Sequence, residues 1–490
     1  MLLSTLATAD PSLEPGPEAG AWAPIDIAGL SADSRAVAPG FLFAALVGSR
    51  NDGSQFVADA LAKGAVAILA AGGSPLVVPQ GLPILRSPEP RRSLALLASR
   101  FHPQQPAVTV AVTGTSGKTS VAEFTRQIFA SCSRRAASLG TIGLVRPEGA
   151  TYGSLTTPDP VVLHRTLDGL ARGGVTHLAL EASSHGLDQF RLDGVRLTAA
   201  AFNNLGRDHL DYHPDMTAYL DAKLRLFREL LGPGQPAVVN VDGEGAAKAI
   251  EAARARGLTV LTTGAQGRTL QLVSAGRVGF RQRLEIGHGG RRYEVDLPLI
   301  GGYQASNALV AAALAIACGE APEAAIAALA GLAGVRGRLE VTGEVDGALV
   351  VVDYAHKPEA LAAALDALRP FATGRLVCVF GCGGDRDRGK RPIMGEIASR
   401  KADVVIVTDD NPRSENAGGI RAEIIAGAGR VQEIADRAEA IRTAVGQLRP
   451  GDVLLVAGKG HEIGQIVGEE VHPFSDHEET THAIRARIDG

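Results

Sequence analysis

Short apolar runs alternate with longer helix-like stretches through the middle of this chain. The apolar runs lie at Val108–Val112, Leu178–Glu181, Ala199–Asn203 and Val238–Asn240, and helical patterns at Pro160–Arg172 and Thr217–Leu230 separate them. Buried strands that alternate with helices are typical of a mostly parallel sheet covered on both faces. The pattern therefore predicts an α/β fold for this segment.

The pattern changes on both sides of this segment. A Pro-rich leader ends near Pro24, and short strands at Phe41–Leu46 and Val66–Leu69 then predict a small α/β domain. Residues 257–295 favour short alternating strands, which predict an insertion or a β-edge, before Ala305–Cys318 returns to a helical pattern.

A further set of buried strands follows a break at Gly334–Arg338. These strands are expected at Leu349–Asp353, Leu376–Phe380, Val404–Thr408 and Val453–Ala457. We therefore predict three domains: a small N-terminal α/β domain (1–103), a central phosphate-loop domain with helices on both faces of its sheet (104–335), and a C-terminal Rossmann-like α/β domain (336–490).

Length and composition exclude several classes of protein. The chain has 490 residues, 45% hydrophobic and 21% charged, with a formal net charge of −4, so a nucleic-acid surface is not expected. Its four cysteines are too scattered for a disulfide framework and are expected to be small buried residues. With no membrane-length apolar run and no basic leader, we expect a cytoplasmic monomer that acts on small molecules and contacts no nucleic acid and no membrane.

The strongest local signal is a phosphate-binding loop between Val112 and Val121. Gly114, Gly117, Lys118 and Thr119 form a contracted version of the usual glycine-lysine pattern, behind a strand and ahead of a helix. Glycines let backbone N–H groups turn toward a phosphate, the lysine adds charge, and the hydroxyl can bind Mg²⁺. The alternative is a Gly-rich strand-to-helix turn with an incidental lysine.

Polar residues also follow two later strands of the predicted sheet. Glu181 ends one strand and is a candidate Mg²⁺ ligand, with a helix-capping acid as the alternative. Asn203 begins a dense polar run that contains Asp208 and His209, which is hard to explain by the fold alone. Lys223, by contrast, has the helical spacing of an ordinary solvated lysine.

Four strand ends in the third segment carry polar or charged loops. These loops begin at Asp353, Gly381, Asp409 and Gly458. Open α/β sheets bind ligands at the carboxyl ends of their strands, so four converging loops favour a binding cleft over surface turns.

Taken together, these motifs resemble the ATP-dependent Mur ligases over nearly the whole chain and in the same order. The matching motifs are Gly114–Thr119, Glu181–His185, Asn203–Leu205, Asp208–Asp211, Asp353–His356 and Asp410–Arg413. Ser116 departs from this pattern, because much of the family has asparagine there. The resemblance implies a three-domain ligase that uses ATP and Mg²⁺ to add 2,6-diaminopimelate to UDP-N-acetylmuramoyl-L-alanyl-D-glutamate through an acyl phosphate, in peptidoglycan precursor synthesis.

The resemblance also implies a role for each matching residue. It implies catalytic roles for Lys118, Glu181, His209 and Lys223, with Thr119, Glu181, His209 and a carbamylated Lys223 as metal ligands. The nucleotide would contact Gly114, Thr115, Ser116, Gly117, Lys118, Thr119, Ser120, Asn307 and Arg338. Ser34, Ser49, Arg50 and Asn51 would contact the uridine nucleotide, and Thr156, Thr157, Ser183, Gln189 and Arg191 the muramoyl dipeptide. Arg386, Asp410, Asn411, Pro412, Arg413, Gly458 and Glu462 would form the amino-acid site.

Arg413 gives the sharpest expectation about specificity. Diaminopimelate differs from lysine by a second carboxylate, which a planar guanidinium binds with paired, charge-assisted hydrogen bonds. We therefore expect meso-diaminopimelate as the amino acid. The alternatives are a folylpolyglutamate synthase, which gives no reason for the Asp410–Arg413 motif, and a non-catalytic nucleotide-dependent switch.

Overall fold

The computed structural model describes all residues except 16–23, 49–51, 152–154, 211 and 490. The chain divides into two compact units. The first contains Met1–Lys118, Thr125–Thr263 and Ala313–Ala321, and the second contains Thr119–Phe124, Gly264–Ala312 and Pro322–Gly490. Both contain strands and helices, and the α/β class predicted from the sequence is confirmed.

The N-terminal part of the first unit is a five-stranded sheet with helices. Its elements are α1 (Leu3–Ala7), β1 (Glu14–Pro15), β2 (Gly29–Ser31), β3 (Phe41–Ala44), α2 (Val57–Ala62), β4 (Ala65–Ala71), β5 (Ile84–Ser87) and α3 (Pro90–Phe101). The strand order is β1-β5-β4-β3-β2, and only β1 runs antiparallel to its neighbour. Leu3 and Leu6 of α1 are fully buried, so the leader begins with a helix that the sequence analysis missed.

The larger part of the first unit carries the phosphate loop. Its elements are β6 (Val108–Thr113), α4 (Lys118–Ser131), β7 (Ala136–Gly140), β8 (Gly143–Arg146), β9 (Gly149–Thr151), α5 (Pro160–Arg172), β10 (His177–Glu181), α6 (Ser184–Asp188), β11 (Ala199–Phe202), α7 (Met216–Arg225), β12 (Pro236–Asn240), α8 (Ala246–Ala255) and β13 (Thr259–Gly264). Six strands run parallel in the order β13-β12-β11-β6-β10-β7, and β8 and β9 add an antiparallel edge.

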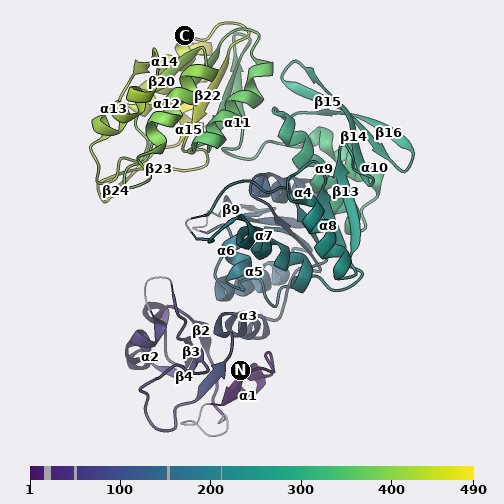
Figure 1. Ribbon diagram of the computed structural model, residues 1–490, viewed down its shortest axis with the longest axis vertical. Helices are drawn as coiled ribbons and strands as arrows, with labels where there is room; N and C mark the ends of the chain where they lie inside the picture. The colour runs from purple at the N-terminus through teal and green to yellow at the C-terminus, as the bar shows by residue number, and fades with distance from the viewer. Residues whose placement is uncertain (16–23, 49–51, 152–154, 211, 490) are drawn as a thin grey trace. The chain divides into compact units, whose positions relative to one another are not determined.

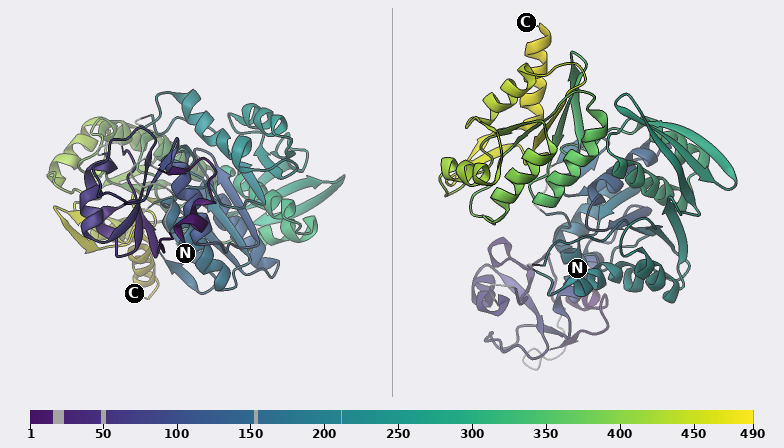
Figure 2. Two further views of the ribbon diagram at one scale, coloured as in Figure 1. Left: turned by 90° about the horizontal axis from the view of Figure 1, so that it is seen from below. Right: turned by 45° about the horizontal axis from the view of Figure 1, so that its top comes forward.

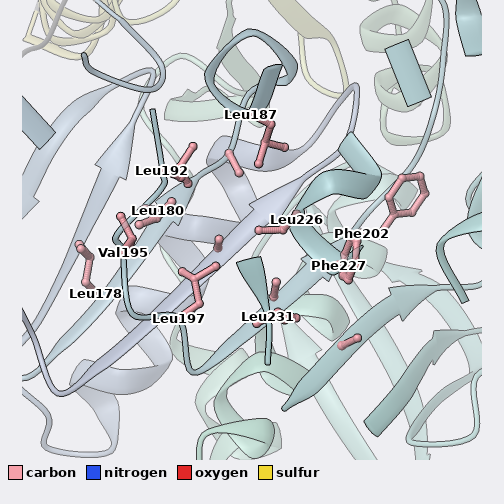
Figure 3. Packing of buried hydrophobic residues seen from close by; sticks show 14 of the residues in the cluster. Leu178, Leu180, Leu187, Leu192, Val195, Leu197, Phe202, Leu226, Phe227 and Leu231 are labelled. Carbon is pink, nitrogen blue, oxygen red and sulfur yellow. The ribbon is translucent and has the colours of Figure 1, made fainter. Parts of the chain in front are cut away.

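Helix α5 shows how local sequence fixes an element of this layer. The Asp159 side chain accepts hydrogen bonds from the N–H groups of Val161 and Val162, both at 3.1 Å, and Pro160 occupies the first turn, where its missing N–H costs nothing. Leu163 and Leu167 face the core, which Figure 3 shows around Leu180, Leu197 and Phe227. Burial of this apolar face holds the helix against the sheet.

The Gly264–Ala312 segment of the second unit contains long antiparallel strands. They are β14 (Leu270–Val278), β15 (Arg281–His288) and β16 (Arg291–Leu297), which lie side by side in Figure 2. The sequence predicted this β insertion but only short strands, because their outer positions are polar and exposed. Helix α9 (Gly302–Ala317) follows, with its residues from Ala313 onward counted in the first unit, and then helix α10 (Pro322–Ala327).

The C-terminal part of the second unit is a three-layer α/β sandwich. Its strands are β17 (Glu340–Val345), β18 (Ala348–Asp353), β19 (Leu376–Phe380), β20 (Val404–Val407), β21 (Gln432–Glu433) and β22 (Val453–Ala457), with a separate hairpin, β23 (Gly464–Val467) and β24 (Glu470–Pro473). Its helices are α11 (Pro358–Leu368), α12 (Lys390–Lys401), α13 (Ala417–Gly427), α14 (Arg437–Gly446) and α15 (Asp476–Asp489). The sheet order is β17-β18-β22-β19-β20-β21, parallel except for β17.

Alternation along the strands fills both faces of this sheet. Leu349 and Val351 belong to the core under α11, α12 and α13, whereas Val350 and Val352 belong to the core under α14 and α15. The two helix layers are visible in Figure 1. Strands buried on both faces read as continuous apolar runs, which is why they were predicted from the sequence.

Two sequence expectations about single residues are wrong. Lys223 is not a solvated helix lysine, because only 1% of it is exposed. Of the four cysteines expected to be buried, Cys378 and Cys382 are, but Cys132 and Cys318 are half-buried. No helix in the described part of the chain is long and apolar enough to cross a membrane.

Candidate active site

The phosphate loop leaves β6 and enters α4 through two glycines in the left-handed half of backbone space. Gly114 has φ +154° and Gly117 has φ +80°. A β-carbon at Gly114 would lie 3.1 Å from Cβ of Asn203 and 3.2 Å from N of Asn204, so a larger residue would push this loop away from the next strand end. Lys118 begins α4 and donates hydrogen bonds from Nζ to the carbonyl oxygens of Gly114 (2.8 Å) and Thr115 (3.0 Å).

Two asparagines after β11 hold the loop from the other side. Oδ1 of Asn204 accepts hydrogen bonds from the backbone N–H groups of Thr115 (3.2 Å) and Ser116 (2.9 Å). Nδ2 of Asn203 donates to the carbonyl oxygen of Ser116 at 2.9 Å. Backbone N–H groups that converge on one oxygen are the donors that a phosphate oxygen requires.

Lys223 lies buried under the same loop. Its Nζ donates to the carbonyl oxygen of Gly114 at 2.8 Å and lies 4.2 Å from the centre of the Tyr219 ring. Burial, together with the nearby charge of Lys118, lowers the pKa of Lys223 to about 6. Near neutral pH its side chain is therefore largely an uncharged, nucleophilic amine.

Tyr219 links this lysine to the loop, a role that the sequence did not reveal. It is fully buried, and its hydroxyl lies 3.1 Å from Oγ1 of Thr115. Oγ1 of Thr115 in turn accepts from the N–H of Gly206 at 2.8 Å. The only sign of Tyr219 in the sequence is that it lies one helical turn before Lys223.

Glu181 ends β10 beside β6, and its carboxylate has a defined orientation. Oε1 accepts from the N–H of Thr141 at 2.7 Å, and Oε2 lies 3.3 Å from Oγ1 of the same residue. Its position requires Gly140, because a β-carbon there would lie 2.0 Å from Oε1 of Glu181. The carboxylate is thus held at the strand end rather than used as a helix cap.

The five residues assigned to the muramoyl dipeptide form one hydrogen-bonded group around Glu181. Oγ1 of Thr157 donates to the Glu181 carbonyl oxygen at 2.9 Å, and the Ser183 hydroxyl lies 3.0 Å from the same threonine. Arg191 donates to the carbonyl oxygen of Thr157 at 2.7 Å and to Oε1 of Gln189. Thr156 is connected to this group through Thr141, since the hydroxyl oxygens of the two threonines lie 3.0 Å apart. The sequence reasoning missed Thr141.

His209 lies in an aromatic cluster next to this group. It has a left-handed backbone (φ +54°), and its ring centre lies 4.8 Å from that of His185 and 6.1 Å from that of Tyr219. Among the residues described, no three His, Cys, Asp or Glu side chains form a ready-made metal site. A metal here would therefore rely on hydroxyl, water, phosphate or carbamate oxygens besides Glu181 and His209.

Asn307 and Arg338, the two residues of the second unit that were assigned to the adenine nucleotide, are linked through Gln304. Nδ2 of Asn307 donates to Gln304, whose own Nε2 donates to the carbonyl oxygen of Arg338 at 3.3 Å. The guanidinium of Arg338 stacks 4.8 Å from the centre of the Tyr354 ring. The Asp353 carboxylate is buried and accepts from the N–H of Leu339 at 2.7 Å, and burial raises its pKa.

The loops assigned to the amino acid meet at the ends of β19, β20 and β22. A β-carbon at Gly383 would lie 2.8 Å from Nη1 of Arg413 and 3.9 Å from Cγ of Arg386, and one at Gly384 would lie 1.9 Å from the Pro412 oxygen. Nδ2 of Asn411 donates to Glu462 at 2.9 Å. A β-carbon at Gly458 would lie 2.6 Å from Oδ2 of Asp410. The structure therefore brings these seven residues together.

Burial shifts the pKa values of two charged groups in this site. It raises the pKa of Glu462 and lowers that of Lys459, a fully buried lysine 3.6 Å from Asp410 and 3.7 Å from Glu462. Lys459 was not among the residues expected from the sequence.

Ser34, which was assigned to the uridine nucleotide, lies in the N-terminal part of the first unit. It is buried, and its carbonyl oxygen accepts from Nζ of Lys63 at 3.0 Å. Ser49, Arg50 and Asn51 lie outside the described residues.

Comparisons with known proteins identify the family. Residues 26–102 match the Mur ligase family catalytic domain, residues 112–315 the Mur ligase middle domain, and residues 337–460 the Mur ligase glutamate ligase domain. The chain is 56% identical over 494 aligned residues, covering 100% of both proteins, to the UDP-N-acetylmuramoyl-L-alanyl-D-glutamate--2,6-diaminopimelate ligase of Bradyrhizobium diazoefficiens. This chain belongs to the Mur ligase family.

Solved structures agree with this membership. One Mur ligase, a UDP-N-acetylmuramoyl-L-alanyl-D-glutamate--2,6-diaminopimelate ligase, superposes with a TM-score of 0.74 at 33% identity and covers 100% of both chains. A folylpolyglutamate synthase of Mycobacterium tuberculosis has a TM-score of 0.60 at 19% identity over 75% of this chain, which shows a shared fold alone. The three Mur ligase domains follow the order expected from the sequence.

Proposed function

We propose that this Mur ligase joins meso-2,6-diaminopimelate to the D-glutamate of UDP-N-acetylmuramoyl-L-alanyl-D-glutamate and converts ATP to ADP and phosphate. The observation that carries the proposal is the 56% identity, over the whole chain, with a relative that bears the name of that activity. We further propose that it works as a cytoplasmic monomer, with domains close to 1–103, 104–335 and 336–490.

In this proposal the phosphate loop holds the ATP phosphates. The N–H groups of Thr115 and Ser116, which now donate to Asn204, would donate to phosphate oxygens. Lys118 would turn from the Gly114 and Thr115 carbonyls to offset the charge on the transferred phosphoryl group. Gly117, Thr119 and Ser120 complete the loop, and Asn307 and Arg338 would face the adenine nucleotide.

The residues around Glu181 fit Mg²⁺. The carboxylate is held by Thr141, and Lys223 is a buried amine with a pKa of about 6. Such an amine can attack CO₂ and release a proton, which leaves a carboxylate on Nζ. Thr119, Glu181 and His209 would hold one Mg²⁺ and carbamylated Lys223 a second, and these ions would neutralise charge on the phosphates when bound.

The dipeptide and the amino acid would be positioned by separate groups. Thr156, Thr157, Ser183, Gln189 and Arg191 orient the D-glutamate carboxylate toward phosphorylation, with Ser34 and residues 49–51 at the uridine end. Arg413, with Arg386, Asp410, Asn411, Pro412, Gly458 and Glu462, holds diaminopimelate so that its amine attacks the acyl phosphate and phosphate leaves. The guanidinium of Arg413 would bind the carboxylate that lysine lacks.

The test is phosphate release from ATP in the presence of UDP-N-acetylmuramoyl-L-alanyl-D-glutamate. We expect release with meso-diaminopimelate and far less with L-lysine or with no amino acid. Equal release with lysine would keep the ligase and overturn the specificity. No release in any tube, but release with a folate and glutamate, would favour a folylpolyglutamate synthase, and binding of ATP without turnover would favour a switch.

A further inference from the structure

The β23–β24 hairpin is attached to the Asp410–Arg413 loop by its backbone. The N–H of Arg413 donates to the Ile466 oxygen at 3.0 Å, and the N–H of Gly468 donates to the Arg413 oxygen at 2.8 Å. These two bonds form a parallel bridge between Arg413 and Val467, outside the main sheet. The backbone N–H and carbonyl oxygen of Arg413, the proposed specificity residue, are therefore both hydrogen-bonded to the hairpin.

Side chains add to this attachment. Nε2 of Gln465 donates to the Asp410 carbonyl oxygen at 2.7 Å, and the N–H of Ile466 donates to Oδ1 of Asn411 at 3.0 Å. The buried Lys459 donates from Nζ to the same Asn411 oxygen at 2.7 Å and to the Gly464 oxygen at 2.8 Å. Three of the four residues of this loop, Asp410, Asn411 and Arg413, are thus held by hydrogen bonds from the hairpin and Lys459.

Arg413 needs such fixing because its backbone is unusual. It has φ +51°, a region that residues with a β-carbon rarely adopt and that persists only where the surroundings determine it. The side chain then reaches Gly384, to whose oxygen Nη1 donates at 2.9 Å. A loop free to relax to negative φ would aim the guanidinium elsewhere.

The hairpin itself has little core to hold it in place. All four residues of β24 are exposed, and in β23 Gly464, Gln465 and Ile466 are only half-buried. Its hydrogen bonds to the loop are therefore its main connection, apart from its chain ends, to the rest of the unit.

We propose that Gln465 is a positioning residue for amino-acid selection and that the hairpin Gly464–Pro473 holds Arg413 in its binding geometry. The inference rests on the proposed function and adds a specificity determinant that lies outside the amino-acid site assigned above. Gln465 touches the loop and acts through it on Arg413. Loosening this contact should weaken selection between diaminopimelate and lysine more than it slows the chemistry.

The variants Gln465→Ala and Gln465→Glu test this. The first removes the donor, and the second keeps the size but replaces the N–H donor with an oxygen. The matched control is His472→Ala, because His472 lies opposite Gln465 in the hairpin and its ring lies near Glu470, at 3.7 Å, rather than against the loop. All three changes are on half-buried or exposed positions, and thermal melting checks that each protein folds.

Two measurements give the readout. We expect the KM for diaminopimelate to rise about tenfold in both Gln465 variants, the change that corresponds to one hydrogen bond, with kcat and the KM for ATP nearly unchanged. The preference for diaminopimelate over L-lysine in kcat/KM should fall by a similar factor. Deuterium uptake by backbone amides of residues 410–415 should increase in these variants, and His472→Ala should leave all of these quantities at their wild-type values.

The outcomes separate the two proposals. Wild-type protein that does not ligate diaminopimelate overturns the proposed function, whatever the exchange experiment shows. Wild-type protein that ligates it while the Gln465 variants keep KM, preference and exchange unchanged overturns the positioning role. An equal effect in His472→Ala would also overturn it, because the hairpin would then act only through general stability.

Discussion

Lys223 donates a hydrogen bond to the backbone oxygen of Gly114, a residue 109 positions earlier in the chain, at 2.8 Å. Lys118 donates to the same oxygen, also at 2.8 Å. One carbonyl of the phosphate loop thus accepts from two lysines, of which one begins a helix and the other is buried. Burial lowers the pKa of Lys223 to about 6, so this lysine readily loses its proton near neutral pH.

This relationship predicts that Lys223 acts as an anion after reaction with CO₂ and not as a cation. Lys223→Ala should lower kcat by at least about a hundredfold, a loss typical of a removed electrostatic group. Short-chain carboxylates should restore part of the activity, because they replace the missing charge. Lys223→Arg is the matched control, since it supplies a long, positively charged side chain that cannot be carbamylated, and it should stay inactive with or without carboxylate. Full activity of the arginine variant would contradict the prediction.

Gly140→Ala should disturb Glu181, whose side chain supplies the three atoms nearest to the new β-carbon. The new β-carbon would lie 2.0 Å from Oε1, so the carboxylate must leave the N–H of Thr141. We expect kcat to fall by about a hundredfold and the Mg²⁺ concentration for half-maximal rate to rise. Gly169→Ala is the control: Gly169 is in helix α5 with open space around its β-position, so the change should leave kcat intact and stabilise by about 0.5–1 kcal/mol. Unchanged kcat in Gly140→Ala would refute the role of this carboxylate.

His164 predicts a loss of stability in mild acid. It is fully buried, its Nε2 lies 2.9 Å from the Asp193 oxygen, and burial lowers its pKa from 6.5 to about 4. Between these pH values the unfolded chain binds more protons than the folded one, so the free energy of unfolding decreases as pH falls from about 6.5 to about 4, by up to about 3 kcal/mol. His164→Gln should show a shallower decrease in urea unfolding over this range, and an identical pH profile would contradict the assignment.

The elements that the sequence predicted well are those whose signals are local. Helix α5 has its predicted bounds because an aspartate cap and a proline mark its start and two glycines follow its end. Strands β19 and β22 also have their predicted bounds, because residues buried on both faces form unbroken apolar runs. The hairpin β23–β24 has neither signal, since none of its strand residues is fully buried and they form no unbroken apolar run, and the sequence did not predict it.

The site was predictable in its residue types but not in its geometry. Lys223 has the spacing of a solvated lysine, and only packing of α7 under the phosphate loop buries it. The roles of Tyr219, Thr141 and Lys459 depend in the same way on neighbours far away in the chain. The left-handed backbone of Arg413 could not be predicted from its neighbours in the sequence. It is held by hydrogen bonds from Ile466 and Gly468, which lie far along the chain.

Because Arg437 and Asp476 form a buried ion pair, we expect that removing one partner lowers the free energy of unfolding far more than removing both. Both side chains are 0% exposed, with Nε to Oδ1 at 2.7 Å, and Arg437 also donates to the Ala457 oxygen at the end of β22. Arg437→Met alone should lower the free energy of unfolding by about 3–5 kcal/mol, because it leaves a buried carboxylate unpaired. Arg437→Met with Asp476→Leu should recover most of this loss in urea denaturation. Lys248→Ala, which breaks an exposed pair with Glu251, should cost less than about 0.5 kcal/mol.

If Arg413 binds the second carboxylate of diaminopimelate, its replacement should lower the preference for diaminopimelate over L-lysine. Arg413→Lys keeps a positive charge and the same backbone requirement but loses the paired N–H donors, and Arg413→Ala loses both charge and donors. We expect kcat/KM for diaminopimelate to fall about tenfold in the lysine variant and about a thousandfold in the alanine variant, while kcat/KM for L-lysine changes little, since L-lysine offers no second carboxylate to bind. Steady-state phosphate release with each amino acid measures both ratios. Arg388→Ala is the control, because Arg388 lies in the neighbouring loop, is 67% exposed and pairs with Glu423, so its loss should alter neither ratio. Equal losses with diaminopimelate and L-lysine in Arg413→Ala would mean that the arginine supports the loop and does not read the substrate.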